Sequence, residues 1–180
     1  RVGLDYDSPA PGLGGGVGQI ANAIAPWNSS GMRLALQAGT ARGPRCLSTF
    51  EGNSRISITF NDPCGEISDS GSVLGLGGAY MTPVFSVVGG TTFSKIVQGM
   101  VVLNNSPGAL TFLSNPNCFQ DAIAHNLGHA IGLGHSEQTS ALMWPDPQSG
   151  CTATPTDLSP DDVAGIRAIY PGGGAAPPPR

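Results

Sequence analysis

All 3 histidines of this 180-residue chain lie within one short stretch, His125-Asn126-Leu127-Gly128-His129-Ala130-Ile131-Gly132-Leu133-Gly134-His135. Positions i and i+4 of a helix lie one above the other, so the imidazoles of His125 and His129 can reach the same ion. Gly132 can adopt the left-handed conformation that ends a helix, and Gly134 lets the chain turn again so that His135 returns to the metal. The stretch therefore predicts one zinc ion on three histidines, with a fourth position open for water.

Two other interpretations of this stretch are possible. Three unrelated, metal-free histidines would have to reproduce by coincidence the spacing of the zinc motif H-E-x-x-H-x-x-G-x-x-H. A purely structural zinc usually has Cys or His at its fourth position, and no candidate remains once the cysteines pair. The spacing favours a zinc site of the catalytic type.

Helix signals flank the histidines on both sides. Asn117 can cap the helix that carries them, with Gln120 answering three residues later. The last helix has Ser159 as its cap, Pro160 in its first turn and Asp162 closing a capping box. The residues predicted to face inward from these two helices are Phe119, Ile123, Leu127 and Ile131, then Val163, Ile166 and Ile169.

An earlier helix is predicted near the start of the chain. It places Val17, Ile20, Ala21 and Ile24 on one face and ends near Trp27. Pro26 must end or kink this helix at its last turn because proline cannot donate the helical hydrogen bond.

Strands are predicted where apolar residues alternate with polar ones or form short buried runs. The segments are 2–6, 32–38, 55–60, 74–80 and 96–103, of which 74–80 is thinned by glycines. The expected order is strand, helix, four strands and then two helices. We find no internal repeat.

The composition excludes several classes of protein. Charged residues make up only 11% of the chain, the net charge is −4, and the 8 Lys and Arg residues are scattered without a basic stripe. Nucleic-acid binding therefore has no support. No apolar run approaches the ~18 residues of a membrane span, and we expect a monomeric, loop-rich globule.

The cysteines are Cys46, Cys64, Cys118 and Cys151, an even set without a C-x-x-C pair. This suits two disulfides in an oxidising compartment better than a thiolate metal site, and it favours secretion. Three pairings are possible, and the order of the predicted strands favours Cys46 with Cys64 and Cys118 with Cys151. The competing interpretation is four buried free thiols in a cytosolic protein.

At the histidine stretch the chain resembles the metzincin zinc endopeptidases, and Ser136 after the third histidine resembles their matrixin branch. The segment 141–145, Ala-Leu-Met-Trp-Pro, is similar to the family's Met-turn, in which Met143 would underlie the metal. Segments 158–162 and 58–60 are also similar to matrixins. The resemblance covers most of the chain.

The resemblance implies an α+β fold with a mixed, twisted sheet and two helices in an upper subdomain, about residues 1–135. A smaller lower subdomain, about 136–171, would end in a helix, and 172–180 would be a Gly/Pro-rich tail or linker. A peptide or protein substrate would lie between the subdomains. It would pair with the sheet edge 75–80, which includes Gly78, Ala79 and Tyr80, and 145–148, including Pro145, would wall the pocket beside the zinc.

Three features depart from the family pattern. The family's general-base glutamate is replaced by Asn126. The His- and Asp-rich region that carries a second zinc and calcium ions in animal matrixins is replaced by 82–95, which has neither residue type, so calcium binding stays open. Pro44-Arg45-Cys46 is similar to the inhibitory cysteine segment of matrixin propeptides, but it lies between two predicted strands, which favours a disulfide.

Asn126 changes what the site can do. In the family reaction the glutamate takes a proton from the activated water and returns it to the leaving amine, and a carboxamide cannot take that proton. Three accounts remain: a deliberate inactivating substitution, a natural relative that binds without cutting, or an enzyme with a weakened mechanism. We favour an inactivated or strongly impaired form of a genuine endopeptidase, because the rest of the site is complete.

Overall fold

The structure is a computed structural model, and it describes residues 2–7, 13–41, 45–68, 73–146, 151 and 157–171. The predicted tail 172–180 lies outside the described residues. The elements follow in the order β1 (Val2–Tyr6), α1 (Val17–Ser29), β2 (Leu34–Ala41), β3 (Arg55–Thr59), β4 (Gly75–Val88), β5 (Thr91–Leu103), α2 (Pro107–Leu113), α3 (Pro116–Ala130) and α4 (Pro160–Ile169).

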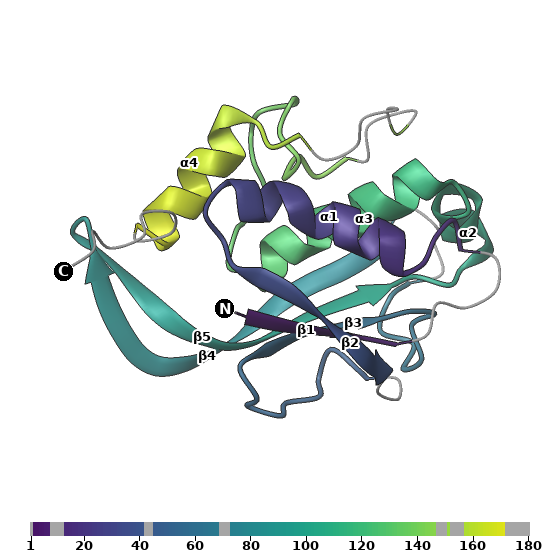
Figure 1. Ribbon diagram of the computed structural model, residues 1–180, viewed down its shortest axis with the longest axis horizontal. Coiled ribbons are helices and arrows are strands. Elements are labelled where there is room, and N and C mark those ends of the chain that lie inside the picture. The colour runs from purple at the N-terminus through teal and green to yellow at the C-terminus, as the bar shows by residue number, and fades with distance from the viewer. Residues whose placement is uncertain are drawn as a thin grey trace.

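The five strands form one mixed sheet in the order β2-β1-β3-β5-β4. β1 pairs in parallel with β2 and β3, β3 pairs in parallel with β5, and only β4 runs antiparallel to its neighbour. The helices α1 and α3 cover one face of this sheet (Figure 1). The predicted α+β class with a mixed sheet is confirmed, and β4 is left as an edge strand.

The core lies between the sheet and the helices α1 and α3. Leu4 and Ile58 from the sheet and Phe119 from α3 are fully or almost fully buried in it. The indole of Trp27 on α1 donates a hydrogen bond of 3.0 Å to the carbonyl of Ala124 on α3. This buried bond fixes α1 against the helix that carries two histidines.

The prediction for α1 was right for Ile20 and Ile24 but wrong for Val17 and Ala21, and the helix ends two residues beyond Trp27. The helix buries Ile20, Ala23, Ile24 and Trp27, whereas Val17 and Ala21 are exposed. It also continues through Pro26 to Ser29. The proline removes one backbone donor only a turn before the end, where the helix packs through Trp27 and the cost of the lost bond is small.

Two helix starts differ from the sequence prediction. α3 begins at Pro116, and its cap is Asn115, whose side chain accepts a hydrogen bond from the Asn117 amide. Both asparagines have the chemistry of a cap, so local sequence could not choose between them. The short helix α2 was missed, although Ser106 caps it and Pro107 occupies its first turn.

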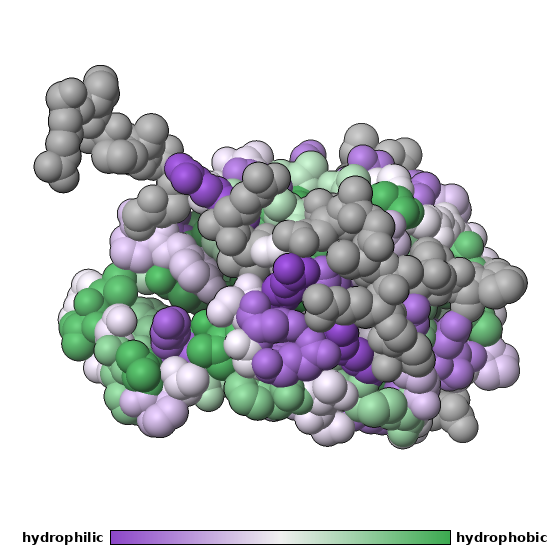
Figure 2. All heavy atoms as spheres, turned by 60° about the horizontal axis from the view of Figure 1, so that its bottom comes forward, coloured by the Kyte–Doolittle hydropathy of each residue, from purple (hydrophilic) through white to green (hydrophobic). Residues whose placement is uncertain are grey.

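The strands β4 and β5 extend past the predicted segments into a long hairpin, which closes at Gly89 and Gly90, both with positive φ. Its outer part exposes large apolar side chains, and Figure 2 shows hydrophobic residues gathered at this end of the molecule: Met81, Val84, Phe85 and Val87. Both faces are exposed here, so the residues do not alternate as in a half-buried strand. That is why the sequence did not reveal this extension.

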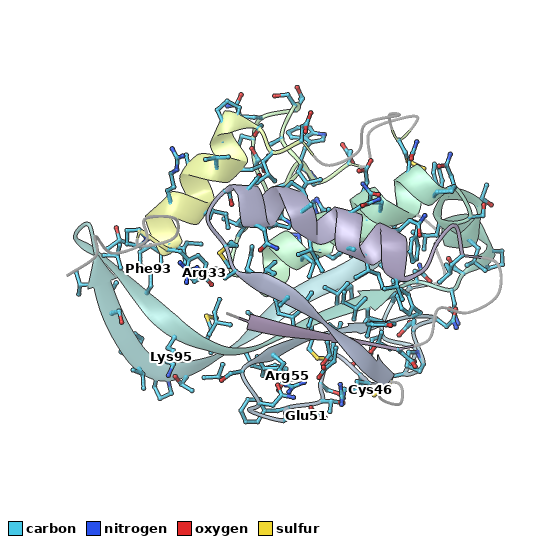
Figure 3. All side chains as sticks on the ribbon, viewed as in Figure 1. Arg33, Cys46, Glu51, Arg55, Phe93 and Lys95 are labelled. Carbon is cyan, nitrogen blue, oxygen red and sulfur yellow. A yellow bond between two sulfur atoms is a disulfide. The ribbon has the colours of Figure 1, made fainter. Side chains whose placement is uncertain are left out.

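Both predicted disulfides, Cys46–Cys64 and Cys118–Cys151, are present. Cys46 lies with Glu51 and Arg55 on the side of the sheet away from the helices (Figure 3), and its predicted role as a disulfide cysteine is confirmed. Cys118 ties the start of α3 to the segment before α4. In the part of the chain that the structure describes, no helix is long and apolar enough to cross a membrane.

Candidate metal centre

The three histidines meet at one point on the surface of α3. His125 and His129 lie one turn apart on this helix, and Gly132 at φ 102° turns the chain so that His135 comes back beside them. Nε2 of His129 lies 3.1 Å from Nε2 of His125 and 3.2 Å from Nε2 of His135. A tetrahedral zinc with Zn–N bonds of ~2.0–2.1 Å separates its nitrogens by about 3.3 Å, so the triad has the dimensions of a zinc site.

The expected contribution of Gly134 is not seen. Its backbone is not left-handed, and a Cβ atom there would meet open space. The single left-handed turn at Gly132 is sufficient to return His135 to the cluster.

Hydrogen bonds at the far side of the rings set the tautomers. Nδ1 of His125 lies 2.7 Å from the carbonyl oxygen of Leu142, and Nδ1 of His129 lies 2.9 Å from that of Leu133. A carbonyl oxygen can only accept, so each Nδ1 carries the proton and each Nε2 presents a lone pair. Lone pairs facing one another at such short distances fit a bound cation and repel each other without one.

Burial also keeps these imidazoles neutral. It lowers the pKa of His125 to about 4, with the Leu142 hydrogen bond opposing this effect, and it lowers the pKa of His129 in the same way. Neutral imidazole is the form that binds a metal ion.

Met143, which the resemblance assigns to a Met-turn, packs against α3 beside Gly128. Its side chain is buried, and its carbonyl accepts a hydrogen bond of 2.9 Å from the Ser136 amide. Gly128 on α3 has room for no side chain, because a Cβ there would collide with the sulfur of Met143. The buried carboxylate of Asp162 accepts hydrogen bonds from the amides of Leu142 and Met143, which joins α4 to this turn.

Asn126 directly follows His125 on α3, and it is 4% exposed. Its Nδ2 donates a hydrogen bond of 2.8 Å to the carbonyl of Ala122 on the preceding turn. Half of the carboxamide is therefore held by the helix itself.

A cavity of about 620 Å³ opens beside the histidines. One wall is α3, another is residues 73–77 with the start of β4, and a third is the segment around Leu142, Trp144 and Pro145. Glycines let β4 approach α3, because a Cβ at Gly75 or Gly77 would collide with Asn126. The volume is in the range of small-molecule and side-chain pockets, about 300–1,000 Å³.

The residues predicted for substrate binding divide between the cavity and the rest of the sheet edge. Pro145 lines the cavity, whereas Gly78, Ala79 and Tyr80 lie farther along β4. The Tyr80 hydroxyl donates to the Leu47 carbonyl at 2.5 Å, on the side of the sheet away from α3. Gln148 lies outside the described residues.

Asp121 was missed by the sequence analysis. It lies on α3 one turn before His125 and lines the cavity, where burial raises the pKa of its carboxyl group to about 6. The i, i+4, i+8 spacing of Asp121, His125 and His129 could have shown that the three share a helix face.

The structure brings no second metal cluster together in the ranges it describes. The histidine triad is the one group of at least three His, Cys, Asp or Glu side chains there with ligand atoms close enough to share an ion. Segment 82–95 forms the outer part of the β4–β5 hairpin.

Comparison with known proteins places these features in a family. The matrixin family model matches residues 51–171, which contain the cavity, the histidines and α4. Relatives include matrix metalloproteinase-19 of Mus musculus, 55% identical over 47 residues, and stromelysin-1 of Mus musculus, 47% identical over 47 residues. Metalloendoproteinase 1-MMP of Arabidopsis thaliana is 41% identical over 51 residues.

These alignments cover only a small part of this chain and of each relative. They cover 26% to 28% of this chain and 8% to 14% of the relatives' own length. The family model, in contrast, spans most of the sheet-to-helix core and the complete metal centre. The chain therefore belongs to the matrixin family.

Proposed function

We propose that this chain is a zinc-dependent endopeptidase domain of impaired turnover, formed by residues 1–171. His125, His129 and His135 hold one zinc ion, and the cavity beside them receives a side chain of a peptide. The observation that carries the proposal is the convergence of three Nε2 atoms at 3.1 and 3.2 Å beside the cavity. Zinc in such a site would supply the Lewis acidity that activates water and polarises a peptide carbonyl.

The edge strand β4 offers the peptide a place to bind. It is the last strand of the sheet, and its first residues line the cavity. An extended peptide can add to such an edge through main-chain hydrogen bonds while one pocket reads a side chain. We assign the continuation of this edge, Gly78 to Tyr80, to the same binding groove.

Asn126 limits the reaction because it cannot hold or move a proton. Its Nδ2 also donates to the Ala122 carbonyl, which fixes the orientation of the carboxamide. Peptide binding needs no proton transfer, and it should persist. The second candidate function is a zinc-bound module that binds peptides without cutting them. The presence of Asn126, which cannot transfer a proton, favours it.

Replacing Asn126 by glutamate tests the proposal. A carboxylate cannot donate to the Ala122 carbonyl, so it should turn into the cavity that residue 126 already lines. We expect Asn126→Glu to raise hydrolysis of a broad peptide library by roughly 10²–10⁴-fold, the usual worth of a positioned general base. Asn126→Gln is the matched control, since it has the length of glutamate without its proton chemistry, and it should stay as slow as the parent.

The outcome separates the two candidate functions. Cleavage by the Glu form at unchanged zinc content supports the endopeptidase. A folded, zinc-loaded Glu form that cleaves nothing refutes it, and retained peptide binding would then establish the binding module.

The disulfides Cys46–Cys64 and Cys118–Cys151 support a secreted protein. Structural disulfides persist in oxidising compartments and are rare in the cytosol. The substrate class that follows is an extracellular peptide or protein.

A further inference from the structure

Asp121 lines the cavity, where its side chain can contact a bound peptide. It lies on the same face of α3 as His125 and His129, and one helical turn places it about 6 Å along the helix axis from His125. It therefore belongs to the wall beside the metal centre and not to the metal site itself.

The carboxyl group of Asp121 lacks a partner for one of its oxygens. Within the described ranges, its Oδ1 is buried from solvent without a hydrogen bond. An unsatisfied buried oxygen costs free energy, and a small rotation of the carboxylate toward a cationic partner in the cavity would remove this cost.

No lysine or arginine stands among the described residues that line the cavity with this carboxylate. The described lining of the cavity has three carboxylates, Asp121, Asp146 and Asp157, and neither Lys nor Arg. The sequence has no Lys or Arg anywhere from residue 96 to residue 166, a range that covers every segment of the site except the start of β4. Burial keeps His125 and His129 neutral, so these two side chains do not supply a positive charge either.

Much of the remaining wall is apolar. Its apolar residues include Leu76, Ala122, Leu142 and Trp144. Lysine and arginine bury their aliphatic stems along such surfaces while their charged ends reach a polar group. An apolar surface beside one half-buried carboxylate is complementary to a side chain of this kind.

We propose that Asp121 is a specificity-determining residue that selects a lysine or arginine side chain of the bound peptide. The aliphatic stem packs on the apolar wall, and the charged end donates hydrogen bonds to Asp121. Asp146 and Asp157, both exposed, add negative potential at the same cavity. This inference rests on the proposed peptide-binding function and names the class of peptide.

Peptide binding to the zinc-loaded protein tests the proposal. Asn126 is kept, so that the peptides are not cleaved. The probes are hexapeptide pools in which one position at a time is lysine, norleucine or glutamate, with affinity measured by fluorescence anisotropy. Norleucine has the hydrocarbon stem of lysine without its charge. At one position, lysine should bind roughly 10- to 100-fold more tightly than norleucine, the range of a well-formed, partly desolvated charge pair.

Three variants identify the residue responsible. Asp121→Asn, which is nearly isosteric, should reduce the lysine preference to below about threefold, while Asp121→Glu should retain much of it. Glu137→Gln makes the same change of charge at an exposed residue outside the cavity lining, and it should leave the preference unchanged. Zinc content and circular dichroism confirm that each variant is loaded and folded.

The failures of the two proposals are distinguishable. Norleucine equal to or better than lysine at every position, or a lysine preference that survives Asp121→Asn, overturns this inference and leaves peptide binding intact. If no pool binds the zinc-loaded protein at all, the proposed function is refuted, and the inference that rests on it is refuted with it.

Discussion

At the scale of single residues, Gly128 shows how closely the metal helix packs on the Met-turn. Alanine there would drive a Cβ into the buried Met143 side chain and against Trp27. We expect Gly128→Ala to lower the free energy of unfolding by about 1–3 kcal/mol, as overpacking does, and to weaken zinc binding. Gly18→Ala is the control, since its Cβ would meet open space on α1. It should raise the free energy of unfolding by at most about 1 kcal/mol. Chemical denaturation measures the free energy of unfolding of both variants. Equal changes in the two variants would contradict this packing.

Asp121 also predicts a pH dependence of stability. Burial raises its pKa from 3.8 to about 6, so the folded state binds this proton more tightly than the unfolded state. The resulting stabilisation is complete below the unfolded pKa and is lost as the pH rises through about 6. In metal-free protein, Asp121→Asn should therefore be more stable than the parent at pH 8, and the two should converge near the unfolded pKa.

The other titratable groups of the cavity are His125, His129, His135, Asp146 and Asp157, and both proteins share them. The difference between the two unfolding curves consequently reports residue 121. A difference that does not change with pH would show that the carboxyl group is not perturbed by burial.

At the scale of elements, the two disulfides are expected to differ in function more than in stability. Their sequence separations are 18 and 33 residues, and the loop entropies predict a loss of about 3–4 kcal/mol for either pair replaced by serine. Only Cys118 and Cys151 line the cavity. Their replacement should also weaken peptide binding, whereas the Cys46 and Cys64 pair should not affect it. Unfolding and anisotropy measurements check this, and unchanged peptide affinity in both variants would contradict it.

Helices and strands could be predicted where the residues that determine them are close together in the sequence. The start of α4 follows from Ser159, Pro160 and Asp162, and the structure has this capping box. The outer hairpin could not be found, because it is exposed on both faces and shows no alternation. Its strand β4 also contains Pro83 at a shift of register. The role of Asp121 needed tertiary structure, since a single aspartate on a helix usually indicates only a solvated face.

At the scale of the whole molecule, the metal centre joins parts that are distant in the sequence. The histidines come from α3 and the chain after it, and their Nδ1 hydrogen bonds reach Leu133 and the Met-turn residue Leu142. Asp162 then connects this turn to α4. Zinc should therefore stabilise the fold as well as the site, because it binds the folded arrangement only. The spacing of three histidines was enough to predict this centre from sequence, but the cavity walls come from β4, α3 and the segment after the Met-turn.

The most direct test is zinc K-edge X-ray absorption of the protein dialysed with one equivalent of zinc. The structure predicts three imidazole nitrogens and one further light ligand at ~2.0–2.1 Å, as expected for a triad with an open position. Sulfur ligands near ~2.3 Å, or a zinc that is lost on dialysis, would contradict the account.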